Sequence, residues 1–233
     1  MPSSQDPARY WSWQRAGTAG SSVAGRVYAA VSTEIVSGEL PAGTMVTEGE
    51  IAGRLGVSRT PVREAFLLLE SQGLLRLFPK KGALVTAMDA AETEHLLQVR
   101  LMLESAAVDL PAVPQDSRGQ ARQAAAADLH RLLARQHKAS EQADPLAFAQ
   151  ADHLFHARVV ASSGNPLIDD FYAQLGPRLA RLSCRVVRQH AADLGRLMAE
   201  HTRLLELFTA ADTGGYAELL HRHVYRPGPS LTD

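Results

Sequence analysis

A carboxylate and three imidazoles in the second half of the chain are the residues whose types suggest metal chemistry. Asp152 and His156 stand four residues apart, so on a helix both side chains point to the same side. His201 and His223 follow in later segments near the C-terminus. One aspartate oxygen and three histidine nitrogens from facing helices are a plausible ligand set for a divalent metal such as zinc or nickel. Because the chain has 9 histidines, this spacing alone also arises easily by accident.

A second chemically suggestive set is basic and lies in the first third of the chain. Residues 47–65 read as two short helices joined by a tight turn, and the second helix carries Arg59 and Arg63 one turn apart. The arginine fork can bond guanine O6 and N7 together, or grip a phosphate. Arg54, Lys80 and Lys81 are expected along the flanking DNA backbone. The pattern is typical of a helix presented to a DNA groove.

Local signals place these basic residues on a winged helix-turn-helix, which we expect over residues 21–87. Valine or isoleucine recurs every four residues from Val23 to Ile35, which predicts one helical face. Thr47 and Glu50 form a capping box for a second helix, and Ser58 is a good N-cap for a third. The apolar segments 74–78 and 83–86, separated by Pro-Lys-Lys-Gly, then predict a hairpin.

Beyond Met88 the composition favours helix almost throughout. We expect an all-α domain over residues 88–226, a bundle of about six helices whose interior can hold a small ligand. The fold class is therefore mainly α. Short breaks should separate the helices, and they are expected at residues 111–114, 144–145, 163–166, 190–192 and 214–215. Residues 1–20 are expected to form a disordered tail, and residues 227–233 a short C-terminal tail.

The composition limits the classes of protein to which the chain can belong. The 233 residues are 45% hydrophobic and carry a net charge of −1, so nucleic-acid binding must rest on a local basic patch. Residues 54–81 supply one, with six basic residues against two glutamates. Cys184 is the only cysteine, which excludes an internal disulfide and fits a reducing compartment. Without an apolar leader or a membrane-spanning run, a soluble cytoplasmic protein is expected.

These motifs resemble a known family. Leu40-Pro-Ala-Gly-Thr, Leu55-Gly-Val-Ser-Arg-Thr-Pro-Val-Arg-Glu-Ala and Lys81-Gly-Ala-Leu-Val look like the N-terminal domain of GntR-family transcription regulators. The resemblance implies that Arg59, Thr60 and Arg63 meet the major groove, and that the wing tip around Lys81 and Gly82 reaches the minor groove. One departure is Gly49, where the family commonly has arginine; a basic contact is missing there, which is expected to weaken binding or alter operator preference.

The second half resembles the ligand-sensing FCD domain of the FadR-type GntR subfamily. The resemblance is carried by the Arg100–Glu104 segment, the Asp152–His156 segment, Ser163-Gly-Asn, Glu200-His201 and the closing His-Arg-His. About six helices suggest its VanR-like branch. Many of these domains bind a metal through an aspartate and three histidines, which here implies Asp152, His156, His201 and His223. His221 is the rival for the last position, and His153 should lie beside the site or on the surface.

The resemblance also implies an effector. A metal with open positions suits a small carboxylate, and Arg100 is a candidate to pair with a second acidic group of that effector. A structural ion pair between Arg100 and Glu104, one turn on, is the alternative for this arginine.

The sequence therefore predicts a metabolite-responsive regulator that binds a pseudo-palindromic double-stranded DNA operator as a homodimer, with repression as the commoner arrangement. Two rivals remain. In one, the metal is purely structural, and any effector binds elsewhere or is absent. In the other, the metal site activates water, as in a hydrolase, although no further residue is recognisably placed as a base.

Overall fold

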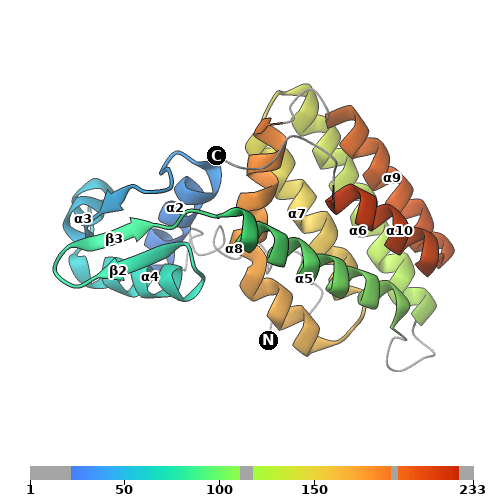
Figure 1. Ribbon diagram of the computed structural model, residues 1–233, viewed down its shortest axis with the longest axis horizontal. Coiled ribbons are helices and arrows are strands. Elements are labelled where there is room, and N and C mark those ends of the chain that lie inside the picture. Colours follow the sequence, from blue (N-terminus) through green and yellow to red (C-terminus); the bar gives the residue numbers. More distant parts are fainter. Residues whose placement is uncertain (1–21, 111–117, 190–193, 226–233) are drawn as a thin grey trace. The chain divides into compact units, whose positions relative to one another are not determined.

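The computed structural model describes residues 22–110, 118–189 and 194–225, and Figure 1 shows its elements. Both expected tails lie outside the described residues, as do the expected breaks at 111–114 and 190–192. The chain divides into two compact units. One contains the described residues up to Met88 together with residues 174–181, and the other contains the rest.

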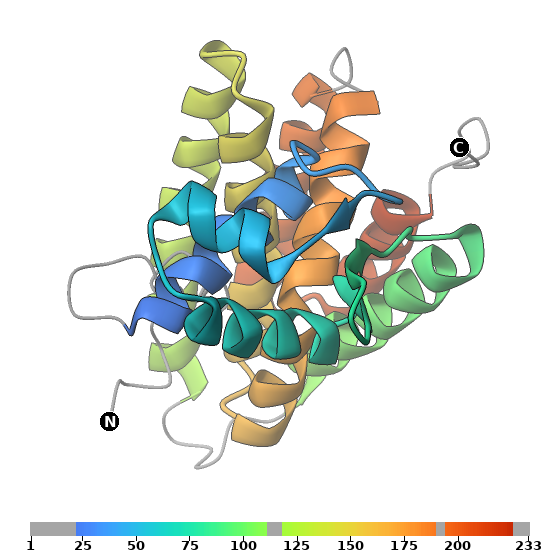
Figure 2. The ribbon, with the colours of Figure 1, turned by 90° about the vertical axis from the view of Figure 1, so that its left-hand side faces the viewer.

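The first unit holds the three helices that the sequence predicts: α2 (Val23–Ser37), α3 (Glu48–Leu55) and α4 (Arg59–Ser71). Figure 2 shows them from dark blue to teal. Both α2 and α3 pack against α4. Val27, Val31 and Ile35 of α2 are buried as the four-residue period predicts, whereas Val23 at its start is 39% exposed.

The helix ends follow the capping signals. The Thr47 hydroxyl accepts from the Glu50 amide at 3.2 Å, and the Glu50 carboxylate accepts from the Thr47 amide at 2.7 Å, so the predicted capping box is present. Gly56 ends α3 in the left-handed conformation, with φ of 66°. Ser58 occupies the N-cap position of α4, but its side chain makes no capping hydrogen bond.

Three short antiparallel strands complete this unit. The predicted hairpin is formed by β2 (Leu75–Phe78) and β3 (Gly82–Val85), and a strand that the sequence did not predict, β1 (Met45–Val46), pairs with the other side of β3. The sheet order is therefore β1-β3-β2. A two-residue strand with one exposed and one buried residue has too little pattern to be recognised from sequence.

Six helices follow Met88 in the part of the chain that the structure describes, as the sequence predicts. They are α5 (Ala90–Asp109), α6 (Arg118–Glu141), α7 (Pro145–Ala161), α8 (Pro166–Gln189), α9 (Leu194–Ala210) and α10 (Thr213–Val224). The break expected near Gly214–Gly215 is present, but both glycines lie in the first turn of α10. The chain turns earlier, at Ala211 and Asp212, and the Asp212 carboxylate caps α10 by accepting from the Gly215 amide at 2.9 Å.

Helix α7 is the centre of this unit. Every side chain from Ala151 to Val160 is buried, and α7 packs against both α5 and α6. A helix that is buried on all sides normally carries apolar residues throughout. The polar residues on α7, Asp152, His153, His156 and Arg158, are therefore exceptions that require partners.

Among the residues that the structure describes, no helix has both the length and the apolar character needed to cross a membrane.

Candidate DNA-binding surface and metal centre

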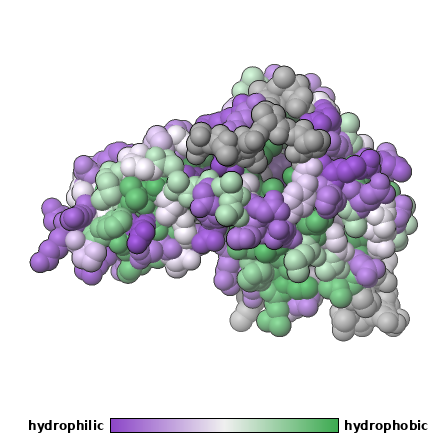
Figure 3. Space-filling model, viewed as in Figure 1, coloured by the Kyte–Doolittle hydropathy of each residue, from purple (hydrophilic) through white to green (hydrophobic). Residues whose placement is uncertain are grey.

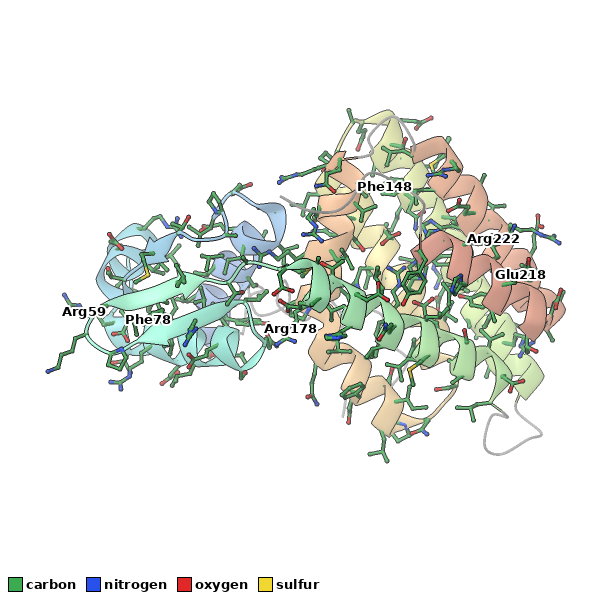
Figure 4. All side chains as sticks on the ribbon, viewed as in Figure 1. Arg59, Phe78, Phe148, Arg178, Glu218 and Arg222 are labelled. Atoms are coloured by element: carbon green, nitrogen blue, oxygen red, sulfur yellow. The ribbon has the colours of Figure 1, made fainter. Side chains whose placement is uncertain are left out.

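A concave surface between α4, the start of α3 and the β2–β3 turn brings together most of the predicted DNA-binding residues. Arg59, Arg63, Lys80, Lys81 and Gly82 all line it. The four basic side chains are exposed. Figure 3 shows hydrophilic residues at the end of this unit where Figure 1 draws the β2–β3 turn, and Figure 4 labels Arg59 and Phe78 at the same end. Four basic side chains thus line the hollow against two glutamates, Glu48 and Glu70, and a recognition-type helix forms one wall.

Two of the predicted DNA-binding residues lie elsewhere in this unit. Arg54 donates to Glu34 at 2.6 Å and does not line the concave surface. Thr60 lines a different hollow, beside Ser22 and Gly56. Because α4 begins at Arg59, the side chains of residues 59 and 60 point about 100° apart around the helix. The structure thus separates Thr60 from the two arginines.

Gly82 at the wing has a structural reason to be glycine. Its φ is 110°, a conformation that favours glycine, and a Cβ atom built there would lie 2.4 Å from the backbone oxygen of Val46. The strand β1 therefore approaches β3 too closely for any side chain at residue 82. Gly82 lets the wing pack against β1.

The four predicted metal ligands converge in the core of the second unit. One ligand atom from each of Asp152, His156, His201 and His223 lies within 4.8 Å of the others, and all four residues are buried. The Nε2 atoms of His156 and His201 are 3.1 Å apart, and Asp152 Oδ1 lies 3.2 Å from His201 Nε2. Ligands about 2.1 Å from one ion lie roughly 3 to 4 Å from one another, so the separations of His201 Nε2 from His156 Nε2 and from Asp152 Oδ1 suit a single ion.

Each histidine of the cluster is held by a hydrogen bond at its other ring nitrogen. Nδ1 of His156 lies 2.7 Å from a Glu104 oxygen, and Nδ1 of His201 lies 2.8 Å from the Gln136 carbonyl oxygen. Nδ1 of His223 lies 2.7 Å from a Glu200 oxygen. Since these acceptors require a proton on Nδ1, each Nε2 is left with a lone pair.

The lone pairs face one another, and this arrangement calls for a cation. With the protons on Nδ1, the Nε2 atoms of His156 and His201 present two lone pairs across 3.1 Å, beside an oxygen of Asp152. Such a contact is repulsive unless a positive charge lies between the atoms. Orientation of metal-binding imidazoles by outer carboxylate or carbonyl partners is the common pattern in metal sites. The residues present therefore fit a divalent metal ion.

Burial keeps the imidazoles in the form that binds metals. It lowers the pKa of His223 to about 3, although the bond to Glu200 opposes the shift, and it lowers the pKa of His156, with the charge of Arg100 acting in the same direction. Burial alone would raise the pKa of Asp152, but the neighbouring His201, His156 and Arg100 hold it well below its usual range. Near neutral pH, His156 and His223 thus offer neutral imidazoles beside the Asp152 carboxylate.

Arg100 lies beside this cluster and is buried. Its Nε donates to Glu104 at 2.9 Å, so the ion pair considered as the alternative is present. Glu104 in turn holds His156, and this carboxylate therefore links the arginine to a candidate ligand. The Nη2 atom of Arg100 is also buried, and it has no hydrogen-bond partner among the described residues. The guanidinium thus keeps one donor that an acidic group could satisfy.

The structure also places the remaining histidines, apart from His190, which lies outside the described residues. His221, the rival for the last ligand position, is exposed and packs on the Tyr225 ring with centroids 4.9 Å apart. His153 is buried and stacks on Tyr172, so it lies in the core rather than on the surface, outside the set of four. His95, His130 and His137 are exposed.

Most of the residues that hydrogen-bond to the four candidate ligands, the outer partners, cannot be recognised from the sequence. Gln136 lies 65 residues from His201, and Ser183, which donates to Asp152 at 2.6 Å, lies 31 residues away. Nothing in the local sequence marks a glutamine or a serine for such a role. Glu104 and Glu200 are partly indicated by the sequence, since Glu104 follows Arg100 by one helical turn and Glu200 is next to His201.

Two family models match the chain. The model of the bacterial regulatory proteins of the gntR family matches residues 23–85, and the FCD domain model matches residues 95–226. An uncharacterized HTH-type transcriptional regulator of Agrobacterium vitis is 37% identical over 154 residues, which cover 61% of this chain and 85% of that protein. The gluconate operon transcriptional repressor of Bacillus subtilis is 27% identical over 208 residues, with 85% of this chain and 80% of the repressor covered.

Solved structures show the same fold. Escherichia coli McbR/YncC superposes with a TM-score of 0.70 at 24% identity, covering 87% of this chain and 93% of that one. A regulator from Rhodococcus sp. RHA1 also gives a TM-score of 0.70, at 20% identity, covering 86% of this chain and 93% of that one. The matched domains and the relatives are transcription regulators rather than enzymes, as the sequence predicts. The chain therefore belongs to the GntR family of DNA-binding transcription regulators, with an N-terminal winged helix-turn-helix and a C-terminal FCD domain.

Proposed function

We propose that this regulator is a repressor that binds a pseudo-palindromic operator as a homodimer and responds to a small carboxylate held at a metal site. Repression is inferred from two relatives, which are named as repressors of a gluconate operon and of a D-xylose utilization operon. A dimer is inferred because one winged helix covers only one half-site, and a two-fold pair reads a short inverted repeat. With operator DNA as its partner, the protein acts in the cytoplasm.

The DNA-binding role rests on the basic concave surface. Arg59 and Arg63 project from the first two turns of α4, and the N-terminal part of a recognition helix is the part that meets base edges. Lys80 and Lys81 stand at the wing tip, where they suit phosphates or the minor groove. Arg54 and Thr60 remain proposed as flanking contacts, and Arg54 would contact phosphate only after exchanging its bond to Glu34.

Arg63→Ala is expected to weaken operator binding by about 1–3 kcal/mol and to relax preference at one base position. The reason is the loss of a bidentate contact to a base edge. Binding should be measured against the operator and against each single-base variant at fixed salt. The matched control is Arg76→Ala, since Arg76 lies over the Phe78 ring 5.5 Å from its centroid and does not line the concave surface. Equal weakening on every sequence would make Arg63 a phosphate contact instead.

The convergence of three imidazole nitrogens and the Asp152 oxygen carries the sensor proposal. A divalent ion such as zinc or nickel held there would supply open coordination positions for a carboxylate if its geometry is octahedral. Helix α7 contributes Asp152 and His156, and α9 and α10 contribute His201 and His223. The outer partners come from α5, α6, α8 and α9, so every helix of the unit touches the site.

Charge around the site favours a divalent cation. The carboxylates of Asp152, Glu104 and Glu200 and the guanidinium of Arg100 sum to two negative charges, which a divalent cation would neutralise. Uncompensated charge is costly in a buried site. The free donor of Arg100 would then serve an acidic or other acceptor group of the effector.

Binding of the effector would act through population shift. Because all six helices carry a ligand or an outer partner, a molecule that enters the site favours whichever packing of the bundle gives it the better contacts. That preference would change the fraction of dimers whose two recognition helices match the operator spacing.

A panel of small carboxylic acids tests the sensor proposal. With the metal-loaded protein, one or more acids should raise the melting temperature and release operator DNA, and chelation should remove both effects. Arg100→Lys is expected to lower affinity for the active acid about tenfold, because lysine keeps the charge but not the fork. His130→Ala, on an exposed face of α6, is the control.

One contrary result would favour a purely structural metal. The burial of all four ligand residues suits such a closed site. If chelation left the affinity for an active acid unchanged, the acid would bind elsewhere and the carboxylate-on-metal proposal would fail.

A further inference from the structure

A glycine on α3 lies directly beneath the guanidinium of Arg59. A Cβ atom built on Gly49 would be 3.5 Å from Nη2 of Arg59 and 3.8 Å from both Cζ and Nε. These guanidinium atoms are the three nearest to that position. Gly49 and Arg59 also line the same concave surface, together with Arg63. The missing side chain therefore borders the group that we assign to DNA, on the face where DNA would lie.

Gly49 is expected to destabilise α3, and nothing in its local backbone requires a glycine. Glycine inside a helix is destabilising relative to alanine, and α3 is only 8 residues long. Gly49 has an ordinary helical backbone, unlike Gly56 with its φ of 66°, so its conformation does not require glycine. Gly53 of the same helix differs in its surroundings, because a Cβ built there meets nothing within 4 Å. Gly49 is thus distinguished by what lies over it, which is Arg59.

We propose that Gly49 is a specificity-determining residue of the DNA-binding surface: it leaves the space in which the Arg59 guanidinium lies against α3, and so sets which base Arg59 meets. The inference rests on the proposed DNA-binding role of Arg59. Arg59 is the first residue of α4, and its long side chain can take several directions from that point. The backbone of α3 at Gly49 fixes one of them. A side chain longer than that of alanine at residue 49 would share this space and turn the guanidinium away.

The distances around Gly49 predict different effects for small and large side chains at this residue. A methyl group at 3.5 Å from Nη2 is in ordinary van der Waals contact, so alanine at residue 49 leaves Arg59 nearly in place. A longer apolar side chain extends into the volume of the guanidinium and displaces it without adding charge. Gly49→Leu therefore isolates the displacement, and Gly53→Leu is the matched control on the same helix, where the added side chain meets open space.

The test measures base preference by selection from a library randomised around the operator half-site. Gly49→Leu should lower selectivity about tenfold at the base position that Arg59→Ala also relaxes. Gly49→Ala should change it less than about threefold, and Gly53→Leu should match the wild type. The salt dependence of binding should stay the same in Gly49→Leu, because no charged residue is added or removed.

A double-substitution cycle separates this proposal from a general effect on folding. In the Arg59→Ala background, Gly49→Leu should cause no further change in base preference, because its effect passes through Arg59. A wild-type preference profile in Gly49→Leu would overturn the inference, and so would an equal change with and without Arg59. Failure of the wild type to select any sequence would instead count against the proposed DNA-binding function.

Discussion

Zinc or nickel ions are expected to raise the melting temperature of the metal-free protein by about 10 °C. An ion present at about a thousand times its dissociation constant stabilises the folded state by about 4 kcal/mol, and each kcal/mol shifts the melting temperature of a domain of this size by roughly 2–4 °C. His201→Ala should abolish the shift. His201 is fully buried, and its Nε2 lies within 3.2 Å of both His156 Nε2 and Asp152 Oδ1, so its loss opens the site on two sides.

His221→Ala is the matched control for this experiment. His221 is a histidine on α10 like His223, yet it is exposed and packs on Tyr225. Its substitution should leave the metal-dependent shift unchanged, and a stoichiometry of one ion per chain should persist. If His201→Ala bound one ion per chain with unchanged affinity, the ion would lie elsewhere and the assignment of the four ligands would be wrong.

Acid should destabilise the metal-free protein between pH 7 and pH 5, well above the pH at which carboxylates titrate. Burial lowers the pKa of His153 and His223 to about 3, whereas an unfolded histidine titrates near 6.5. As the pH falls from 7 to 5, the excess of protons bound by the unfolded state over the folded state therefore rises toward two. This contribution to stability is fully present well above pH 6.5 and is lost as the pH falls through that value, by up to about 3 kcal/mol per pH unit.

Urea unfolding of chelated protein at several pH values measures this loss. His156 acts in the same direction, because burial lowers its pKa as well. His153→Phe is the informative variant, since His153 stacks on Tyr172 and is not one of the four ligands. It should flatten the pH dependence by about 1.4 kcal/mol per pH unit, the contribution of one proton. If the slopes of the two proteins coincided, His153 would not be held neutral in the folded state.

Local signals explain why much of the fold was predictable. The capping box of Thr47 and Glu50, the four-residue period of α2 and the turn glycine Gly56 each involve residues a few positions apart. The elements they predict are present. The strand β1 was not predicted, because its two residues carry no periodic pattern. The start of α10 was placed too late, because Gly214 and Gly215 were interpreted as a break, whereas Asp212 caps the helix.

Long-range contacts explain what remained hidden. Asp152 and His156 were visible as a pair on one helix, His201 and His223 were candidates by residue type, and the resemblance to FCD domains supported all four as one ligand set. Their outer partners depend instead on how the helices pack: Glu104 meets His156 across 52 residues. The pairing of Arg54 with Glu34 across 20 residues is of the same kind. A single sequence does not show which side chains face each other at such separations.

Selection of operator DNA tests the central claim most directly. Metal-loaded protein would be incubated with fragmented DNA from its own source genome, and the retained fragments would be sequenced. We predict enrichment of one short inverted repeat, lost in Arg63→Ala and weakened by the acid that stabilises the sensor domain. Retention of fragments without a common sequence, by folded and metal-loaded protein tested with and without the carboxylate panel, would contradict the account of an operator-specific regulator.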